Sequence, residues 1–289
     1  MEWFVFALGC AILAAFAAVL SKEALNKENA VEFSTALAIT NVVVSIPLVY
    51  WLNINIQPVV WCVIFFSASL GAGGFLLTAK ALRHMEISVI SPLKNFSPAF
   101  TAFLAFIFLS EQLTLMHVAG ISVLILGSYI LEIDFEKHDM LGPLIEIKNS
   151  KYIHVLFGSL AFYAVSAISG KYALSFANPI TVLFLTQLFV AIVFLVYITV
   201  FYDGKRDIID GFENAGKIIV AIAALTVSYR VLQYQAMSME YVSLVIPIKR
   251  MSTLFSTVIG GELFHEEGVW RKSMACVIMI LGATLIVLG

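Results

Sequence analysis

Residues 9–29, GCAILAAFAAVLSKEALNKEN, return in altered form at residues 158–178 as GSLAFYAVSAISGKYALSFAN. The two stretches keep a glycine, a lysine, an Ala-Leu pair and an asparagine in the same order and at one constant separation. The matched residues include Gly9 with Gly158, Lys22 with Lys171, and Asn29 with Asn178. Self-similarity at a fixed separation indicates an internal repeat, so one structural unit is used twice in this chain.

The repeat continues downstream at a slightly longer separation. The matched pairs there are Pro92 with Pro247, Lys94 with Lys249, Glu111 with Glu266, and Gly127 with Gly282. The additional residues fit in the polar segment 203–215, DGKRDIIDGFENA, which we expect to be a loop. Several matches in the right order make coincidence a weak explanation.

The composition identifies the environment of both copies. Of 289 residues, 61% are hydrophobic and 12% are charged, whereas an ordinary soluble domain has roughly 25% charged residues. The chain divides into apolar runs of roughly 18–25 residues, which is the length of a helix that crosses about 30 Å of hydrocarbon. We therefore expect an all-α integral membrane protein with ten transmembrane helices. The expected spans are residues 3–24, 33–52, 59–82, 87–110, 113–131, 152–176, 179–202, 216–237, 243–264 and 268–289.

The odd number of helices in each copy determines how the copies are related. Five crossings leave the chain on the opposite side of the membrane, so the second copy inserts upside down and the two repeats have inverted topology. We expect the first five-helix repeat at residues 1–131, a connecting loop at 132–151 and the second repeat at 152–289. Inverted repeats are typical of secondary transporters, whose substrate site lies near the midplane between the repeats.

The end of the fourth span and the span after it carry a family resemblance. Residues 97–131, SPAFTAFLAFIFLSEQLTLMHVAGISVLILGSYIL, are echoed by residues 252–288, STLFSTVIGGELFHEEGVWRKSMACVIMILGATLIVL. With its five-plus-five helices, the chain resembles the EamA-type branch of the drug/metabolite transporter superfamily. In that family an acidic residue ends the fourth and ninth helices and a glycine-bearing helix follows. The residues that match this pattern are Glu111, Glu266, Gly127 and Gly282. The resemblance covers nearly the whole chain and implies transport of a small metabolite.

Four cations lie deep inside the expected spans, where an ionisable group costs from about 3 kcal/mol upward unless it is hydrated or paired. They are Lys94, Arg230, Lys249 and Arg250. Lys171 lies closer to a helix end, from which its ammonium group is expected to reach the interface. The acidic residues that could neutralise the deep cations are expected at span ends, at Glu86, Glu111, Glu240 and Glu266. Deep cations without deep acids imply a hydrated cavity or an anion supplied by the substrate.

Polar residues recur at three- and four-residue steps around these cations, which places them on one face of each helix. For the hydroxyl groups alone, hydrogen bonding between packed helices is the simpler explanation. We expect the first four helices of each repeat to surround a cavity and the fifth to pack outside it. The expected substrate-binding residues are Lys94, Lys249, Arg250, Arg230, Tyr163, Ser91, Ser252, Thr253 and Asn41, with Pro92 and Pro247 kinking their helices.

The chemistry of these cations favours an anionic group on the substrate. Arginine offers a planar fork for oxyanions, and lysine offers a movable point charge. A lysine on the fourth helix with a Lys-Arg pair on the ninth is also similar to the plastid sugar-phosphate translocators, in which such residues hold the phosphate. That resemblance extends to Lys94, Lys249 and Arg250 only. We expect alternating-access transport of an anionic or zwitterionic metabolite, with an amino-acid or drug exporter of the same fold as the alternative.

Other classes of protein have less support in the sequence. The cysteines (Cys10, Cys62 and Cys276) form no CxxC pair, and the histidines share no helix face with a deep acid, so no metal site, cofactor or catalytic constellation is expected. An intramembrane enzyme, a channel and a structural or receptor membrane protein are the alternatives from other classes. The expected partners are a small-molecule substrate and the lipid bilayer, without nucleic acid, in a monomer or a homodimer.

Two indications of orientation disagree. The resemblance implies that both termini are cytoplasmic. The loops after the odd-numbered spans, including 132–151, carry almost all of the Lys and Arg residues outside the deep positions, and the face with the termini carries almost none. Because short loops rich in Lys and Arg stay in the cytoplasm, the charges favour these loops in the cytoplasm and both termini outside.

Overall fold

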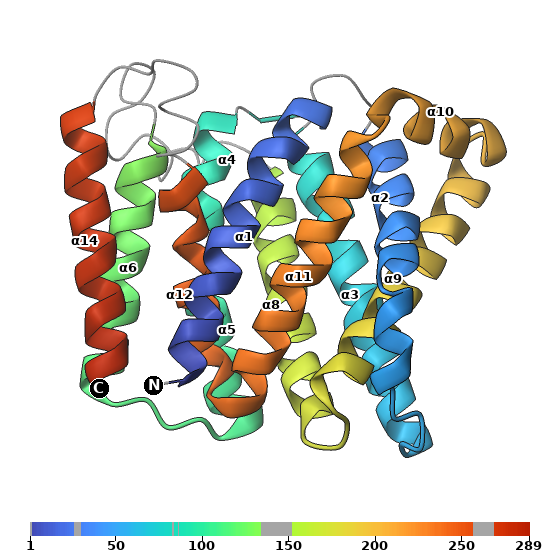
Figure 1. Ribbon diagram of the computed structural model, residues 1–289. Helices are drawn as coiled ribbons and strands as arrows, with labels where there is room; N and C mark the ends of the chain where they lie inside the picture. The colour runs from blue at the N-terminus through green and yellow to red at the C-terminus, as the bar shows by residue number, and fades with distance from the viewer. Residues whose placement is uncertain (1, 26–29, 83, 86, 134–151, 257–268) are drawn as a thin grey trace.

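The computed structural model describes residues 2–25, 30–82, 84–85, 87–133, 152–256 and 269–289 (Figure 1). All the regular elements in these ranges are helices, which confirms the all-α class. They are α1 (Glu2–Leu25), α2 (Ala30–Val44), the 3₁₀ helix η1 (Ile46–Trp51), α3 (Pro58–Leu82), α4 (Ile87–Lys94), α5 (Ser97–Leu109), α6 (Leu115–Glu132), α8 (Tyr152–Leu174), α9 (Pro179–Phe201), α10 (Lys205–Ala215), α11 (Ile218–Met239), α12 (Val242–Arg250) and α14 (Val269–Leu288).

The apolar runs of the sequence form the long helices. Within the described residues, seven helical segments are long and apolar enough to cross a membrane, and Val31–Val44 and Met274–Leu288 are shorter apolar helices. Local signals set several boundaries. The Thr114 hydroxyl accepts a hydrogen bond from the His117 N–H at 3.1 Å at the start of α6, and Asn178 caps α9 directly before Pro179.

Prolines interrupt two of the expected spans. The span expected at 33–52 is α2 followed by η1, with Pro47 in the first turn of η1. The span expected at 87–110 is α4 and α5, separated by a two-residue turn whose N–H groups donate to carbonyls three residues earlier at 3.2 Å. Pro98 lies in the first turn of α5, and within one continuous helix its ring would clash with the carbonyl of Lys94. The interruption therefore lies between Pro92 and Pro98, and Pro98 was not among the residues expected to kink a helix.

The polar segment 203–215 differs from its expected loop structure. Residues 205–215 form α10, a short helix that contacts α2, α9 and α11 at the upper right of Figure 1. Gly211 allows a close approach there, because a Cβ atom at this position would lie 2.8 Å from the carbonyl oxygen of Glu32. The other polar segment, 132–151, lies almost entirely outside the described residues.

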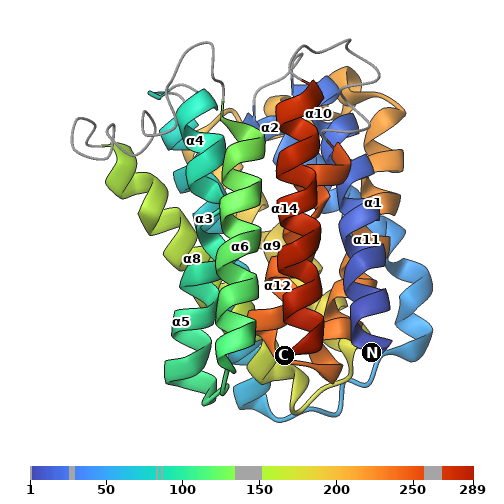
Figure 2. The same cartoon turned by 90° about the vertical axis from the view of Figure 1, so that its left-hand side faces the viewer.

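Helices from the two halves of the chain pack against one another in pairs. The most extensive pairs are α1 with α11, α3 with α8, α2 with α9, and α6 with α14. Figure 1 shows α6 and α14 at the left edge of the molecule, and Figure 2, which looks onto that edge, shows them side by side. Both termini lie at the same end of the bundle (Figure 1).

Candidate functional site

A cavity of about 570 Å³ lies inside the bundle. Its lining comes from α1, α2, α3, α4, α5, α8, α9, α11 and α12, and Ser252 just beyond α12. No described residue of α6 or α14 lines it, in agreement with the expectation that the fifth helix of each half packs outside.

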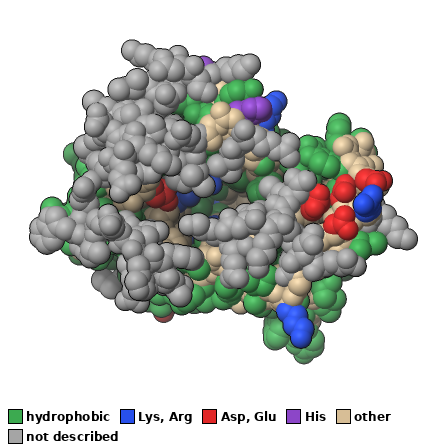
Figure 3. All heavy atoms as spheres, turned by 90° about the horizontal axis from the view of Figure 1, so that it is seen from above, with side chains coloured by type: hydrophobic (Ala, Val, Ile, Leu, Met, Phe, Trp, Pro, Cys, Tyr) green, Lys and Arg blue, Asp and Glu red, His purple; other side chains and the backbone are tan. Residues whose placement is uncertain are grey.

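The cavity extends towards the end of the molecule opposite the termini. Its lining reaches Ser21 near the end of α1 and Phe33 near the start of α2, both at the upper end in Figure 1. Figure 3 looks onto that end and shows a hollow in which basic and acidic side chains are visible. On the side of the termini the lining reaches Gly170 and Met237, near the ends of α8 and α11.

Lys249 and Arg250 are adjacent in sequence but contact different walls of the cavity. The Lys249 ammonium group donates to Gln233 Oε1 at 2.8 Å and lies 5.1 Å from the centre of the Tyr229 ring. Arg250 donates from Nε and Nη2 to the Ser97 hydroxyl at 3.0 and 2.6 Å. Consecutive helical residues point in different directions, so the two cations contact different side chains instead of converging on one point.

One carboxylate near the cations was missed at the sequence level. Glu132, the last residue of α6, interacts electrostatically with both Lys94 and Arg250. The expectation that no acidic side chain lies near the deep cations is therefore wrong for Lys94 and Arg250. Glu132 was overlooked because it ends a span, and only the packing of α6 against α4 and α12 brings it to the cations.

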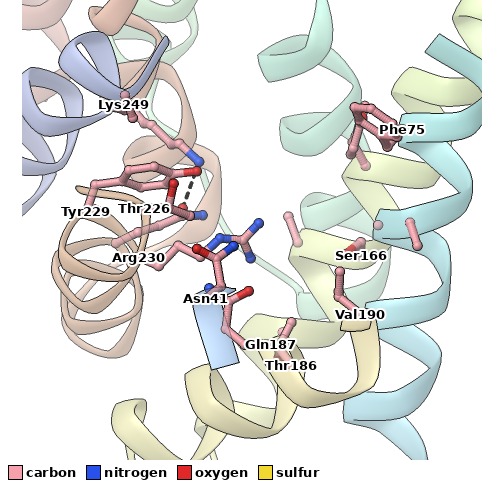
Figure 4. Close-up of a pocket in the computed structure, with 18 of the residues that line it drawn as sticks. Asn41, Phe75, Ser166, Thr186, Gln187, Val190, Thr226, Tyr229, Arg230 and Lys249 are labelled. Carbon is pink, nitrogen blue, oxygen red and sulfur yellow. Dashed lines mark hydrogen bonds between the residues drawn. The ribbon is translucent and has the colours of Figure 1, made fainter. Parts of the chain in front are cut away.

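A second cationic corner surrounds Arg230 of α11. Figure 4 shows its guanidinium directed towards Asn41 of α2 and Gln187 of α9. The side chains of Asn41 and Gln187 are 6% and 2% exposed. Three polar atoms of this corner are buried without a hydrogen-bond partner among the described residues: Arg230 Nε, Asn41 Oδ1 and Gln187 Nε2.

Most of the residues expected to bind substrate line this cavity. They are Lys94, Lys249, Arg250, Arg230, Tyr163, Ser252 and Asn41. Thr253 is not among the lining residues, and its hydroxyl donates to the Arg250 carbonyl at 2.9 Å. The side chain of Ser91 lies outside the described residues. Ser97, Gln187, Tyr229 and Gln233 also line the cavity and were not among the expected binding residues. Gln187 carried a usable signal, because it is the one amide side chain in α9, which contains no charged residue.

Other polar residues connect helices, as the simpler explanation predicted. The hydroxyls of Ser67 on α3 and Ser166 on α8 each donate to the other residue's carbonyl at 2.8 Å. Thr78 donates to the Ser159 hydroxyl at 3.1 Å between the same helices. These bonds satisfy polar groups inside the bundle and hold α3 against α8.

Two charged residues hold the connection between α11 and α12. The Glu111 carboxylate accepts hydrogen bonds from the Val242 and Ser243 N–H groups at 2.9 and 3.1 Å, and from the Ser243 hydroxyl. Lys171 donates to the carbonyls of Met237 at 2.5 Å and Glu240 at 2.9 Å. These carbonyls lie at the end of α11, and the expectation that the Lys171 ammonium group reaches the interface stays a prediction. Glu111 is buried, with 3% exposure, and Glu266, its counterpart in the repeat, lies outside the described residues.

In the described part of the chain, no group of three or more His, Cys, Asp and Glu residues could hold a metal ion. The site therefore offers charge, hydrogen bonds and a space large enough for a small molecule. This is the chemistry of a binding cavity.

Comparisons with known proteins point to one family. The model of the EamA-like transporter family matches residues 1–133 and 150–288. An uncharacterised protein of Methanocaldococcus jannaschii is 32% identical over 106 residues, which cover 30% of this chain and 77% of that protein. A solved crystal structure aligns over 100% of this chain and 99% of its own, with a TM-score of 0.75 and 14% identity. At that identity the structural likeness shows the fold alone.

Proposed function

This chain belongs to the EamA-like transporter family, and on that premise we propose that its central cavity binds a small anionic or zwitterionic metabolite and moves it by alternating access. The family makes the chain a multi-pass membrane transporter of the drug/metabolite type and not an enzyme. The observation that carries the proposal is the convergence of Lys94, Arg230, Lys249 and Arg250 on one cavity. Within the bundle, such a concentration of cations is stabilised by an anionic ligand.

The proposed architecture is ten transmembrane helices in two inverted repeats, residues 1–131 and 152–289, joined by the loop 132–151. The pairing of helices supports it. In the repeat, α1 corresponds to α8, α3 to α11, α2 to α9 and α6 to α14. The contact of α1 with α11 therefore has its symmetric counterpart in the contact of α8 with α3, and the pairs α2–α9 and α6–α14 each join two corresponding helices. The ends of two shorter helices also support it. α4 ends at Lys94, and α12 ends at Arg250, one residue after Lys249, the counterpart of Lys94 in the repeat.

The proposed binding residues are Lys94, Lys249, Arg250, Arg230, Tyr163, Ser252 and Asn41, which line the cavity. Ser91 and Thr253 remain proposed from the sequence pattern. Arg250 is held by Ser97 in an orientation that keeps its fork at the cavity wall. Lys249, on its flexible stem, is positioned by Gln233 and Tyr229.

Transport assays with the purified protein in liposomes test this function. Vesicles preloaded with sugar phosphates, organic acids, amino acids or nucleotides are assayed for saturable uptake and counterflow of each labelled compound. The variants Lys249→Gln and Arg230→Gln are expected to lower the transport rate by roughly ten- to a hundredfold, because a hydrogen bond to a charged group contributes about 1.5–3 kcal/mol.

Arg206→Gln is the matched control. Arg206 lies on α10 with 78% of its side chain exposed and forms a surface ion pair with Asp210. Its variant is expected to transport at the wild-type rate. Wild-type transport of an anion by Lys249→Gln and Arg230→Gln would contradict the proposed site, and absence of saturable uptake of any compound would contradict the function.

We also propose that the loops after the odd-numbered spans are cytoplasmic and that both termini are outside. Support comes from the excess of Lys and Arg in those loops. Alkaline phosphatase fused after Gly289 is expected to be active, because that enzyme matures only outside the cytoplasm. A fluorescent GFP fusion at the same position, together with inactive phosphatase, would reverse the assignment.

A further inference from the structure

The corner of the cavity at Arg230, Asn41 and Gln187 contains more hydrogen-bonding capacity than the described residues satisfy. Each of these residues lines the cavity, and each comes from a different helix (Figure 4). Arg230 Nε, Asn41 Oδ1 and Gln187 Nε2 are buried and have no hydrogen-bond partner in the described part of the chain. A buried polar group without a partner is unfavourable, so these three atoms define positions that a ligand would satisfy.

The three atoms require different groups from a ligand. Arg230 Nε and Gln187 Nε2 are donors, and both bind an oxygen with free lone pairs, such as that of a carboxylate or a phosphate. Asn41 Oδ1 is an acceptor and requires a group that carries a hydrogen. The ligand therefore needs an anionic oxygen group and, next to it, a hydrogen-bond donor.

The charge around this corner decides which donor fits. Arg230 and Lys249 interact electrostatically with each other, and the side chains that also contribute at Arg230 are Tyr229, Tyr234 and Cys10. Within the described part of the chain, no carboxylate contributes to the electrostatic environment of Arg230 or Lys249. Lys94 and Arg250 differ, because Glu132 attracts both of them electrostatically. An ammonium group beside Arg230 and Lys249 would be repelled, whereas a hydroxyl group would not.

We infer that the Arg230 corner recognises an anion bearing a neighbouring hydroxyl group, with Gln187 and Arg230 binding the anionic oxygens and Asn41 accepting from the hydroxyl. This inference rests on the proposed function and narrows it, because it selects hydroxylated anions over zwitterions. It also assigns Gln187 to the binding site.

Three acids with the same three-carbon skeleton test the inference: propionate, lactate and alanine carry a hydrogen, a hydroxyl and an ammonium group, respectively, on the carbon beside the carboxylate. The thermal denaturation midpoint of the purified wild-type protein is measured with each acid at matched concentration and ionic strength, since a ligand of the native state raises the midpoint. Lactate is expected to raise it more than propionate, and alanine least. Equal effects of lactate and propionate, a larger effect of alanine, or no effect of any acid would overturn the inference.

Variants identify the atoms responsible. Asn41→Leu and Gln187→Leu are expected to remove the advantage of lactate over propionate, whereas Gln57→Leu, at an exposed amide before α3, is expected to retain it. Asn41→Asp places a carboxylate at the acceptor position and is expected to reverse the preference from lactate to alanine. Retention of the lactate preference by Asn41→Leu and Asn41→Asp would overturn the assignment.

The same measurements separate this inference from the proposed function. A preference for alanine that requires Arg230 would refute the recognition of a hydroxyl group and would indicate a transporter of zwitterions. If Arg230→Gln and Lys249→Gln both transport an anion at the wild-type rate in liposomes, the anion site itself is wrong.

Discussion

Arg250 uses two of its guanidinium nitrogens to hold one hydroxyl. Nε and Nη2 both donate to Ser97 Oγ, and the Ser97 side chain is buried. Arginine can do this because its donors are fixed in one plane, whereas a lysine ammonium is a point charge on a flexible stem. The contact of residue 250 with Ser97 therefore depends on the planar geometry of the arginine side chain as well as on its positive charge.

Arg250→Lys keeps the positive charge and removes the planar pair of donors. We expect a lower thermal midpoint and transport reduced by at least severalfold, because one or more charge-assisted hydrogen bonds are lost, each contributing about 1.5–3 kcal/mol. Ser97→Ala removes the acceptor instead, and the double variant completes a cycle. If the two effects simply add, Arg250 and Ser97 do not act together, and the role given to this contact is wrong.

At the scale of elements, α12 starts inside the protein without a cap of its own. The residue before it, Tyr241, makes no capping hydrogen bond from its side chain. The first N–H groups of a helix have no partner within it, and here Glu111 accepts from two of them across the bundle. Ser110, directly before Glu111, has a φ of 54°. This left-handed residue ends α5 and turns the chain towards α12.

Glu111→Ala is expected to destabilise the protein, because it leaves two buried N–H groups at the start of α12 without an acceptor. The cost is about 1–3 kcal/mol for a buried donor that loses its partner. It is measured as a lower thermal midpoint in detergent. Glu240→Ala is the control, since among the described residues that carboxylate accepts a hydrogen bond only from the adjacent, exposed Tyr241 N–H. Equal effects of the two variants would show that the cap contributes nothing specific.

At the scale of the whole molecule, one pair of closely packed helices, α6 and α14, lies away from the cavity. A Cβ atom at Gly282 of α14 would lie 2.6 Å from Leu124 N and 2.9 Å from Gly120 O of α6. At Gly127 a Cβ atom would lie 2.9 Å from Met279 N. In lipid, where apolar side chains gain little from leaving the solvent, such close backbone contact is the main source of helix association. These glycines explain why α6 and α14 pack so closely against each other.

Gly282→Ala is expected to separate α6 from α14 and lower the thermal midpoint, because the added methyl group meets backbone atoms that cannot move independently. Overpacking of this kind costs typically about 1–3 kcal/mol. Gly158→Ala is the matched control within a helix, since a Cβ atom there meets only Leu77 Cδ1 at 3.9 Å. A midpoint for Gly282→Ala that equals that of Gly158→Ala would refute the packing argument.

The sequence by itself determined the class, most of the spans, the family resemblance and the candidate cations. This was possible because the free-energy cost of placing polar groups in lipid determines the length and composition of each apolar run. It also indicated that Lys94, Arg230, Lys249 and Arg250 share a cavity. It did not reveal α10, because a short amphipathic helix in a polar segment has the composition of a loop.

Only the tertiary structure decided which groups meet. Glu132 reaches Lys94 and Arg250 because α6 packs against α4 and α12, and Glu111 reaches the start of α12 from a distant part of the chain. Gln187, Asn41 and Arg230 come from three helices, so no local pattern links them. The physical reason is that whether a segment spans the membrane depends on the polarity of its own residues. Which groups form hydrogen bonds or charge pairs depends instead on how the helices pack across the whole bundle.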